Sequence, residues 1–393
     1  DMGVLDAYLG KWRHCFDLFD PERPFYQVAG LAITQPKPPA DIRIECATGN
    51  NATLFDHSTD DQPQELLPPE AARCLLVEQS FGRSGTMGSE RRGPATADAG
   101  PLRSCALVVP TGPSLWASLL LGMVHYDPED DAPIRGTSHD APAWEQEAAA
   151  RAGTRPCRGY LDYLTWNSRR IRLEVRAGPD GQMRVHRVHV TPGCEFGKGV
   201  LGGTLRDPMS AYRRNQKAKP GQAPWSAVCV TETRALWRDS GALLQSLPGQ
   251  GERPALIDWL ARLVAAGFVD SGTTYPIAVY GLRHNPTNTA QVLLWRQERL
   301  PLPLAYLSDH NLVERLTAAL ALAEHVGTAT RRAAASLAHS VLSPDVGRNA
   351  DSDAITRWCK AFPAERLYWS RLEVPFHRLL TRLPEAGGSA LVG

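Results

Sequence analysis

The chain has 393 residues, of which 43% are apolar, and a formal net charge of +1. This length allows two domains, or one large domain with an appendage. The longest apolar patch, SLWASLLLGMVHY, is too short to cross a bilayer, so we expect no transmembrane helix, and we expect no signal peptide. The near-zero net charge neither demands nor excludes a nucleic-acid partner, because local clusters matter more than the total.

The eight cysteines are scattered along the chain, and no two of them have CxxC spacing. This pattern argues against a zinc knuckle. Because a chain of this length does not need disulfides, we expect reduced, buried thiols and a cytoplasmic location.

Short elements separated by loops are predicted for the first part of the chain. In order, they are an amphipathic helix (LDAYLGKWRHCFDLFD), a turn and strand (PERPFYQVAGLA), a loop (residues 41–66), a helix with proline in its first turn (PPEAARCLLVEQSF), a long glycine-rich loop (GRSGTMGSERRGPATADAG), a strand (LRSCALVVPTG) and a buried helix (PSLWASLLLGMV).

The middle of the chain contains a strong hairpin signal. Alternating residues flank GPDG in RIRLEVRAGPDGQMRVHRVHVTPG. An acidic surface loop (residues 126–156) precedes this hairpin. A glycine-rich basic stretch (residues 196–225), two helices (ETRALWRDSGALL and RPALIDWLARLVAAG) and a strand, polar tip and strand (YPIAVYGLRHNPTNTAQVLLWRQERLPLPL) follow it.

After Pro303 the composition changes to Ala, Leu and Arg. One long helix is predicted from Asp309, a plausible N-cap, and a second helical stretch should be kinked or interrupted at Pro363 and Pro375. We therefore predict an α+β fold, with a mixed α/β nucleic-acid-recognition domain over residues 1–303 and a partial helical bundle of two long helices over residues 304–393.

No catalytic motif is found, so we expect a non-enzymatic chain. The best metal-binding candidate is HYDPEDD, with His125, Asp127, Glu129, Asp130 and Asp131, although a solvated acidic loop is the more ordinary meaning of such a stretch. His186 and His189 lie three apart in the predicted hairpin and should face opposite sides of their strand.

The glycine-rich loop and two basic clusters are the sequence features that indicate phosphate binding. Gly82, Gly85 and Gly88 would let backbone N–H groups approach a phosphate or a groove, although a flexible linker has the same composition. SRRIRL and RRNQKAK are the basic clusters, and beside glycine-rich loops such clusters are candidates for phosphate contacts.

The order of these motifs resembles the CasA family, the large subunit of the type I-E CRISPR surveillance complex Cascade. The most specific piece is DYLTWNSRRIRL. The matching pieces cover most of the chain and run FDLFDPERPFYQVAG, GNNATLFDH, SFGRSG, AGPLRSCALVV, APAWE, GYLDYLTWNSRRIRLEV, DPMSAYR and ALWRD.

In that family a loop anchors the subunit against the 5′ end of the crRNA and a neighbouring protein. The resemblance places this loop at GNNATLFDH, with Leu54, Phe55 and Asp56 at its tip and Asn50 and Asn51 shaping it. The two asparagines would cap turns in either case.

Three further elements of the family meet the protospacer-adjacent motif, a short DNA tag beside the target. They are a glycine loop, a lysine and a hairpin with a wedge residue, for which Ala290 or Gln291 is favoured here. On this resemblance the motif-reading residues are Gly82, Gly85, Lys198, Asn288, Thr289, Ala290 and Gln291.

The family role is physically consistent with these residue types. The minor groove is narrow enough to favour small residues, and its pattern of hydrogen-bond donors and acceptors is degenerate. A wedge would unstack one base step at a cost of roughly a few kcal/mol. Contacts to the motif must offset that cost before guide pairing takes over. Arg170 and Arg172 share one face of their strand and would hold backbone phosphates, or else have a structural role beside Trp166.

Two departures from the family are expected. Its initial α/β stretch and two of its four C-terminal helices are not seen here, which suggests a chain truncated at both ends, with exposed apolar surface on the half-bundle. Some members carry a zinc site, but only Cys194 stands in that region, so we predict no metal and no cofactor.

The resemblance implies a DNA-reading, RNA-binding subunit that also serves as a platform for a helicase–nuclease. Two alternatives stay open. One is a metal-dependent enzyme using His125, Asp127 and Asp130, whose carboxylates would have to converge in a pocket. The other is a helical adaptor without nucleic acid, whose association would be insensitive to salt.

Overall fold

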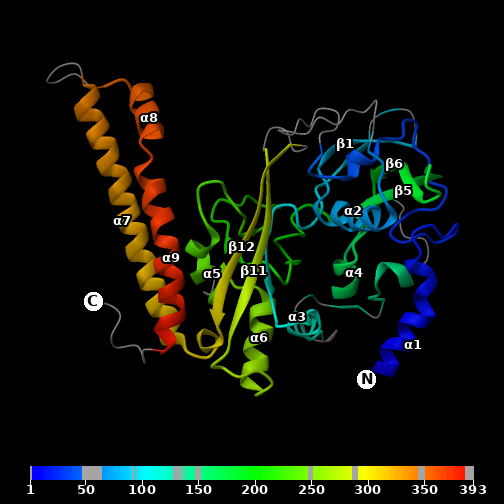
Figure 1. Ribbon diagram of the computed structural model, residues 1–393, viewed down its shortest axis with the longest axis horizontal. Coiled ribbons are helices and arrows are strands. Elements are labelled where there is room, and N and C mark those ends of the chain that lie inside the picture. Colours follow the sequence, from blue (N-terminus) through cyan, green and yellow to red (C-terminus); the bar gives the residue numbers. More distant parts are fainter. Residues whose placement is uncertain are drawn as a thin grey trace. The chain divides into compact units, whose positions relative to one another are not determined.

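The computed structural model describes residues 2–46, 64–90, 93, 95–126, 134, 136–137, 139–146, 152–246, 251–285, 291–343 and 350–385. Helices and small sheets mix along the chain, so the fold is α+β, as predicted (Figure 1). The chain forms two compact units, and the boundary expected at residue 303 does not coincide with their division. The first comprises Asp1–Leu107, His125–Cys229 and Tyr280–Arg296, and the second Val108–Val124, Val230–Val279 and Gln297–Gly393.

The first unit combines short helices with two-stranded pairings. Strands β1 and β2, β5 and β6, and β8 and β9 pair antiparallel, and β4 and β7 pair parallel. The elements are α1 (Met2–Trp12), η1 (Arg13–Phe16), η2 (Pro39–Ile42), α2 (Pro68–Phe81), β1 (Gly85–Met87), β2 (Ala95–Ala97), η3 (Ala143–Glu145), β4 (Gly153–Thr154), α4 (Tyr160–Leu164), β5 (Arg169–Ala177), β6 (Met183–Pro192), β7 (Cys194–Glu195), β8 (Tyr212–Arg214) and β9 (Trp225–Ala227).

The β5–β6 hairpin forms as predicted. Its register runs from Arg169 opposite Pro192 to Ala177 opposite Met183. At the turn, Gly178 N donates to Gln182 O at 2.8 Å, and Gly181 has a φ of 75°, a conformation that favours glycine.

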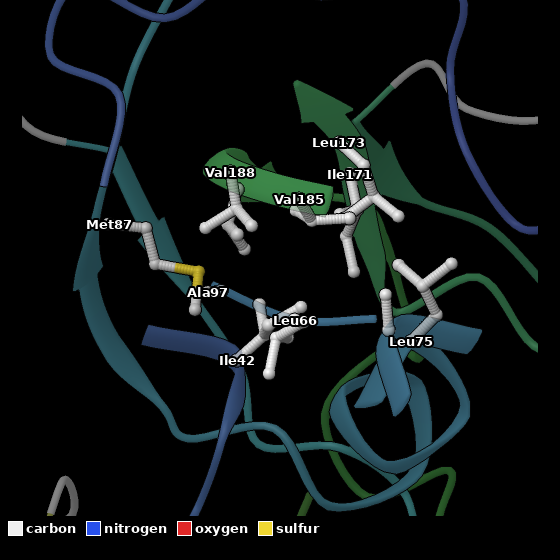
Figure 2. Packing of buried hydrophobic residues seen from close by; sticks show 11 residues of the cluster. Ile42, Leu66, Leu75, Met87, Ala97, Ile171, Leu173, Val185 and Val188 are labelled. Atoms are coloured by element: carbon white, nitrogen blue, oxygen red, sulfur yellow. The ribbon is translucent and has the colours of Figure 1, made fainter. Parts of the chain in front are cut away.

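Helix α2 packs against this hairpin. Apolar side chains from both elements and from the segments beside them meet in one core (Figure 2). Burying an aliphatic side chain of this size contributes about 1.5–3 kcal/mol, so the core fixes α2 against β5. The core residues are Ile42, Leu66, Ala71, Leu75, Met87, Ala97, Ile171, Leu173, Val185, Val188 and Val190.

The second unit contains the C-terminal helices. Strands β3 (Ala106–Pro110), β11 (Thr274–His284) and β12 (Val292–Pro303) form a sheet in the order β12-β11-β3 and carry residues of both units. The other elements are α3 (Leu115–Gly122), η4 (Leu236–Asp239), α5 (Ser240–Leu244), β10 (Gly251–Glu252), α6 (Ala255–Ala265), η5 (Leu304–Leu307), α7 (His310–Leu342), α8 (Ser352–Ala361) and α9 (Ala364–Glu385).

The long helix α7 begins where the sequence predicts. The Asp309 side chain accepts hydrogen bonds from the backbone N–H groups of Asn311 and Leu312, which caps the helix. Leu312, Leu316 and Leu320 are buried on one face of this helix.

Helices α7 and α9 approach closely at Gly327. A Cβ added there would lie 2.5 Å from Cζ2 of Trp369 and 3.1 Å from Cε1 of Tyr368. The Tyr368 hydroxyl donates to Ala323 O at 2.9 Å, which joins the two helices beside this contact. Glycine is therefore required at position 327 by packing.

The second helical stretch divides in two where the sequence suggested an interruption. Helix α8 ends at Ala361 and α9 begins at Ala364, on either side of Pro363, whereas Pro375 lies inside α9. Within the described residues after 303, three long helices thus stand where two were predicted.

Three other predictions were wrong. PERPFYQVAGLA forms turns rather than a strand. The glycine-rich loop contains the small β1–β2 hairpin. PSLWASLLLGMV is helical, but α3 is largely exposed: Leu115, Trp116 and Leu119 keep 77%, 57% and 55% of their surface, and only Leu121 is buried. Apolar composition predicted burial there, although this helix lacks a covering element in the described part of the chain.

Candidate functional site

The glycine loop begins at the C-terminal end of α2. Gly82 N donates to Glu78 O at 3.0 Å, and Gly100 N donates to Gly82 O at 2.9 Å. A Cβ at Gly82 would lie 2.4 Å from Glu78 O and 2.9 Å from Nη2 of Arg169. Gly85 has a φ of 115°, which side chains rarely adopt. The protein's own packing and backbone thus require glycine at both positions.

Arg169, at the start of β5, is hydrogen-bonded to this loop. Its Nη2 donates to Arg83 O at 2.7 Å and to Asp98 O at 2.8 Å, and its Nη1 donates to Ser168 O at 2.8 Å. Its Nε lies 3.3 Å from Oε1 of Glu78. One guanidinium therefore joins both ends of the glycine loop to the end of α2.

Burial controls the electrostatics of this pair. Arg169 and Glu78 keep only 2% and 4% of their surface. Removal from water raises the pKa of Glu78 and lowers the pKa of Arg169, although each side chain favours the charged form of the other. Removing one partner of such a buried pair is strongly destabilising, because the other charge stays buried without compensation.

Lys198 projects from the loop after β7. Gly199, with a φ of 74°, turns the backbone beside it, and the lysine side chain is exposed. Arg169 lines two cavities: one of about 520 Å³, and a smaller one of about 190 Å³ that is also lined by Lys198, Asp98 and Glu195. The structure therefore places two of the predicted elements, the glycine loop and Lys198, around Arg169.

The β11–β12 hairpin reaches the same end of α2. Trp295 on β12 lies against Phe81, with 5.9 Å between ring centroids. The Arg103 Nη1 donates to Phe81 O at 2.6 Å and adds a second buried arginine there.

The predicted wedge lies at the end of this hairpin. Asn288, Thr289 and Ala290 lie outside the described residues. Gln291 is described: its Oε1 accepts from Nδ2 of Asn285 at 2.9 Å, and its O accepts from Asn285 N at 2.9 Å. The side chain and the backbone of Gln291 are thus both paired with Asn285 across the hairpin.

The two arginines predicted to hold phosphates have partners within the protein. Arg170 forms an ion pair with Glu90 at 2.5 Å. Arg172 pairs with Glu174 at 2.7 Å, and Glu174 also accepts from Nε2 of His189 at 2.7 Å. The His189 Nδ1 accepts from Ile33 N at 3.2 Å, and Nη2 of Arg172 also lies 2.7 Å from Nε2 of the same ring. The Arg170–Glu90 and His189–Ile33 contacts join the hairpin to neighbouring segments, whereas those among Arg172, Glu174 and His189 lie within it.

The loop predicted to contact crRNA, with Asn50, Asn51, Leu54, Phe55 and Asp56, lies outside the described residues. Its flanks are described and anchored. Leu66 forms two backbone hydrogen bonds with Val185, at 2.9 and 3.0 Å, and Ile42 is fully buried. The loop thus starts and ends on the core of the β5–β6 hairpin.

The described part of the chain contains neither a candidate metal-binding group nor a candidate membrane-spanning helix. None of its residues form a group of three or more His, Cys, Asp and Glu side chains placed to hold a metal ion. Of the HYDPEDD candidates, His125 is described, and Asp127, Glu129, Asp130 and Asp131 are not. No described helix is long and apolar enough to span a membrane.

Sequence reasoning missed the buried pair Glu78 and Arg169 and the contact made by Trp295. One signal was available for the pair. Glu78 falls on the same helical face as Ala71 and Leu75, both fully buried, and a carboxylate among core positions predicts a buried cationic partner. No comparable signal marks Trp295, because its neighbour Phe81 is distant in sequence.

Comparison with known proteins identifies the family. The profile described as CRISPR-associated protein Cse1 matches residues 1–390. The CRISPR-associated protein CasA/Cse1 of Thermus thermophilus is 35% identical over 382 residues, which is 96% of this chain and 71% of that protein.

Solved structures agree with this result. The crystal structure of Thermus thermophilus CasA superimposes with a TM-score of 0.74 at 29% identity, covering 98% of this chain and 72% of that chain. A chain of a structure described as a CRISPR RNA-guided surveillance complex has the same fold, with a TM-score of 0.71 at 22% identity, 97% coverage of this chain and 72% of that one. This chain belongs to the Cse1 (CasA) family of type I-E CRISPR systems.

Proposed function

We propose that this chain is a non-catalytic large subunit of a crRNA-guided surveillance complex and reads the protospacer-adjacent motif of double-stranded target DNA. Membership of such a complex is supported by the family and by the shared fold with a chain of a CRISPR RNA-guided surveillance complex. Its partners would be the other subunits, the 5′ end of the crRNA through Asn50 to Asp56, the target duplex and a helicase–nuclease that lands on the subunit.

The observation that carries the DNA-reading role is the convergence around Arg169. Gly82 and Gly85 begin one loop tied to Arg169, and Lys198 lines a cavity with the same arginine. Loop backbone and a single exposed cation suit the narrow minor groove, whose few acceptors are shared by related base pairs. Loose reading of several related motifs follows from such contacts.

Duplex opening would begin at the β11–β12 tip. A small side chain there, with Ala290 favoured, would separate the first base step, at a cost of roughly a few kcal/mol. Contacts of Lys198 and the glycine loop would offset this cost until the guide pairs with the target strand. The packing of Trp295 on Phe81 supports this arrangement, because it joins the hairpin to the end of α2 where the glycine loop begins.

The test is a binding titration of the reconstituted complex. The probe is a guide-matched duplex library with randomised base pairs beside the target, so that the best-bound member defines the motif. Selectivity is the ratio of affinities for motif-bearing and motif-free duplexes. We expect Lys198→Ala to lower this ratio, whereas Lys217→Ala, an equal charge change at another exposed lysine, lowers both affinities alike or neither.

Equal affinity of the wild-type complex for all duplexes would contradict the motif-reading role. Binding that is also indifferent to salt would favour the adaptor alternative, because phosphate contacts weaken steeply with salt.

A further inference from the structure

The residues at the start of β5 are hydrogen-bonded to the segment that leads to Lys198. Gly193 N donates to Ser168 O at 3.1 Å, and Cys194 N donates to Asn167 O at 2.8 Å. A Cβ at Gly193 would lie 2.4 Å from Asn167 O and 2.7 Å from Arg169 N, so the two segments touch through their backbones. The position of the Lys198 loop therefore depends on residues 167–169.

The side chain of Arg169 is hydrogen-bonded to the glycine loop, which is the other element proposed to read the motif. A single nitrogen, Nη2, donates to Arg83 O and to Asp98 O, which lie at the two ends of the glycine loop. Asp98 N in turn donates to Oε1 of Glu195 at 3.3 Å, in the segment before Lys198. Both loops thus meet at one residue, although more than a hundred positions separate Gly82 from Lys198 in the sequence.

Both the backbone and the side chain of Arg169 have partners on α2. Gln79 donates from Nε2 to Arg169 O at 2.9 Å and accepts from Arg169 N at 2.8 Å, and Glu78 lies beside Nε. The planar guanidinium can address carbonyls of three segments in a fixed fork. A lysine ammonium is a point charge without that geometry.

We propose that Arg169 is a positioning residue for motif reading: it sets the spacing between the glycine loop and Lys198, so that both meet the same few base pairs. This inference rests on the proposed function, because it assigns the device that aligns its two reading elements. Arg169 is buried and need not touch DNA.

The test uses two variants and one matched control in the reconstituted complex. Arg169→Lys keeps a charge beside Glu78 but loses the fork. The double change Glu78→Gln with Arg169→Met removes both charges together, so that no unpaired charge stays buried. Arg238→Lys is the control, because Arg238 is 8% exposed, pairs with Glu324 at 2.8 Å and belongs to the helical unit.

Two readouts are compared: the selectivity ratio of the duplex library, and backbone amide exchange of residues 83–90 in the free protein. Both Arg169 variants should lose selectivity by about tenfold, as when one charge-assisted hydrogen bond is misplaced, and should exchange faster at residues 83–90. Affinity for motif-free duplexes should stay unchanged. The control should keep both the ratio and the exchange rate.

A retained ratio and unchanged exchange in both variants, with a lost ratio in Lys198→Ala, would overturn the positioning role and leave the proposed function intact. An equal fall in affinity for all duplexes would also overturn it, since this result indicates general destabilisation. If the wild-type complex shows no preference, the proposed function is wrong, and amide exchange alone then decides whether Arg169 holds the loop.

Discussion

The indole ring of Trp295 lies against the phenyl ring of Phe81, with 5.9 Å between their centroids and 58° between their planes. Phe81 is the last residue of α2, immediately before Gly82, and Trp295 belongs to the strand that leads back from the hairpin tip. This one contact joins the hairpin to the glycine loop within the first unit.

Replacing Trp295 by alanine should lower selectivity for motif-bearing duplexes, because the hairpin loses its fixed place beside the loop. Because Trp295 keeps 49% of its surface, its loss should cost about 1 kcal/mol for the aromatic pair, in addition to the transfer free energy of the half of the side chain that is buried. Leu293→Ala, on the same face of β12, is the control for duplex titration and thermal unfolding. Equal effects of the two changes on selectivity would contradict the role of the contact.

Gly82→Ala should destabilise the free protein, in the absence of nucleic acid. The added methyl group would lie 2.4 Å from a backbone oxygen, so backbone must shift, and overpacking of this kind typically costs about 1–3 kcal/mol. Gly30→Ala is the comparison, because its φ is 70° but no atom lies within 4 Å of an added Cβ. Thermal unfolding should show a larger loss for position 82, and an equal or smaller loss would exclude the packing explanation.

The sequence predicted elements whose signal is local. The GPDG turn, the proline-initiated helix α2 and the Asp309 cap each depend on a few neighbouring residues, and all three formed. The exposure of Leu115 and Trp116 on α3 was not predictable, because composition does not say whether another element covers a helix.

The candidate site was predictable only in part. Glycine spacing and the family resemblance indicated Gly82, Gly85 and Lys198 as separate points. Their common neighbour, Arg169, was grouped with Arg170 and Arg172 as a basic cluster. Strand alternation distinguishes these arginines only when the buried face is known, and that face was defined by long-range packing on α2.

Arg170→Ala should leave the salt dependence of duplex binding unchanged, because Glu90 already neutralises the guanidinium. A direct phosphate contact would instead reduce the slope of log affinity against log salt by about 1. The measurement is a titration of a motif-free duplex at several salt concentrations, with Lys198→Ala compared in parallel. A reduced slope for Arg170→Ala would restore the phosphate-holding role.

Glycine-to-alanine changes in two helices should change the stability of the protein in opposite directions. In α7, Gly327→Ala places a Cβ 2.5 Å from the Trp369 ring and should destabilise the helical unit by about 1–3 kcal/mol. In α1, Gly10 has no atom within 4 Å of an added Cβ, so Gly10→Ala should stabilise its helix by up to about 1 kcal/mol. Thermal midpoints of the two variants test this. A midpoint of Gly327→Ala equal to or above that of wild type would contradict the close contact of α7 with α9.

Asp207 gives a pH dependence of stability with a defined sign. It keeps 2% of its surface, and burial raises its pKa from 3.8 to about 6, although the Tyr163 hydroxyl donates to it at 2.9 Å. A raised carboxyl pKa means that the folded protein binds the proton more tightly than the unfolded chain. The stabilising contribution is therefore fully present below about pH 4 and is lost as the pH rises through about 6.

Asp207→Asn should abolish that loss, because the amide oxygen can still accept from Met209 N, which now lies 2.8 Å from Oδ1 of Asp207. Relative to wild type, the variant should gain stability from pH 4 to pH 7 by about 2–3 kcal/mol, the equivalent of two pKa units. Thermal unfolding at several pH values measures the difference. Asp180→Asn is the control: its carboxylate is exposed and its pKa is lowered by Arg184 and the Gln182 N–H, so its variant should differ from wild type by a nearly constant amount between pH 4 and pH 7. A pH-independent difference between Asp207→Asn and wild type would show that Asp207 is ionised at no extra cost in the fold.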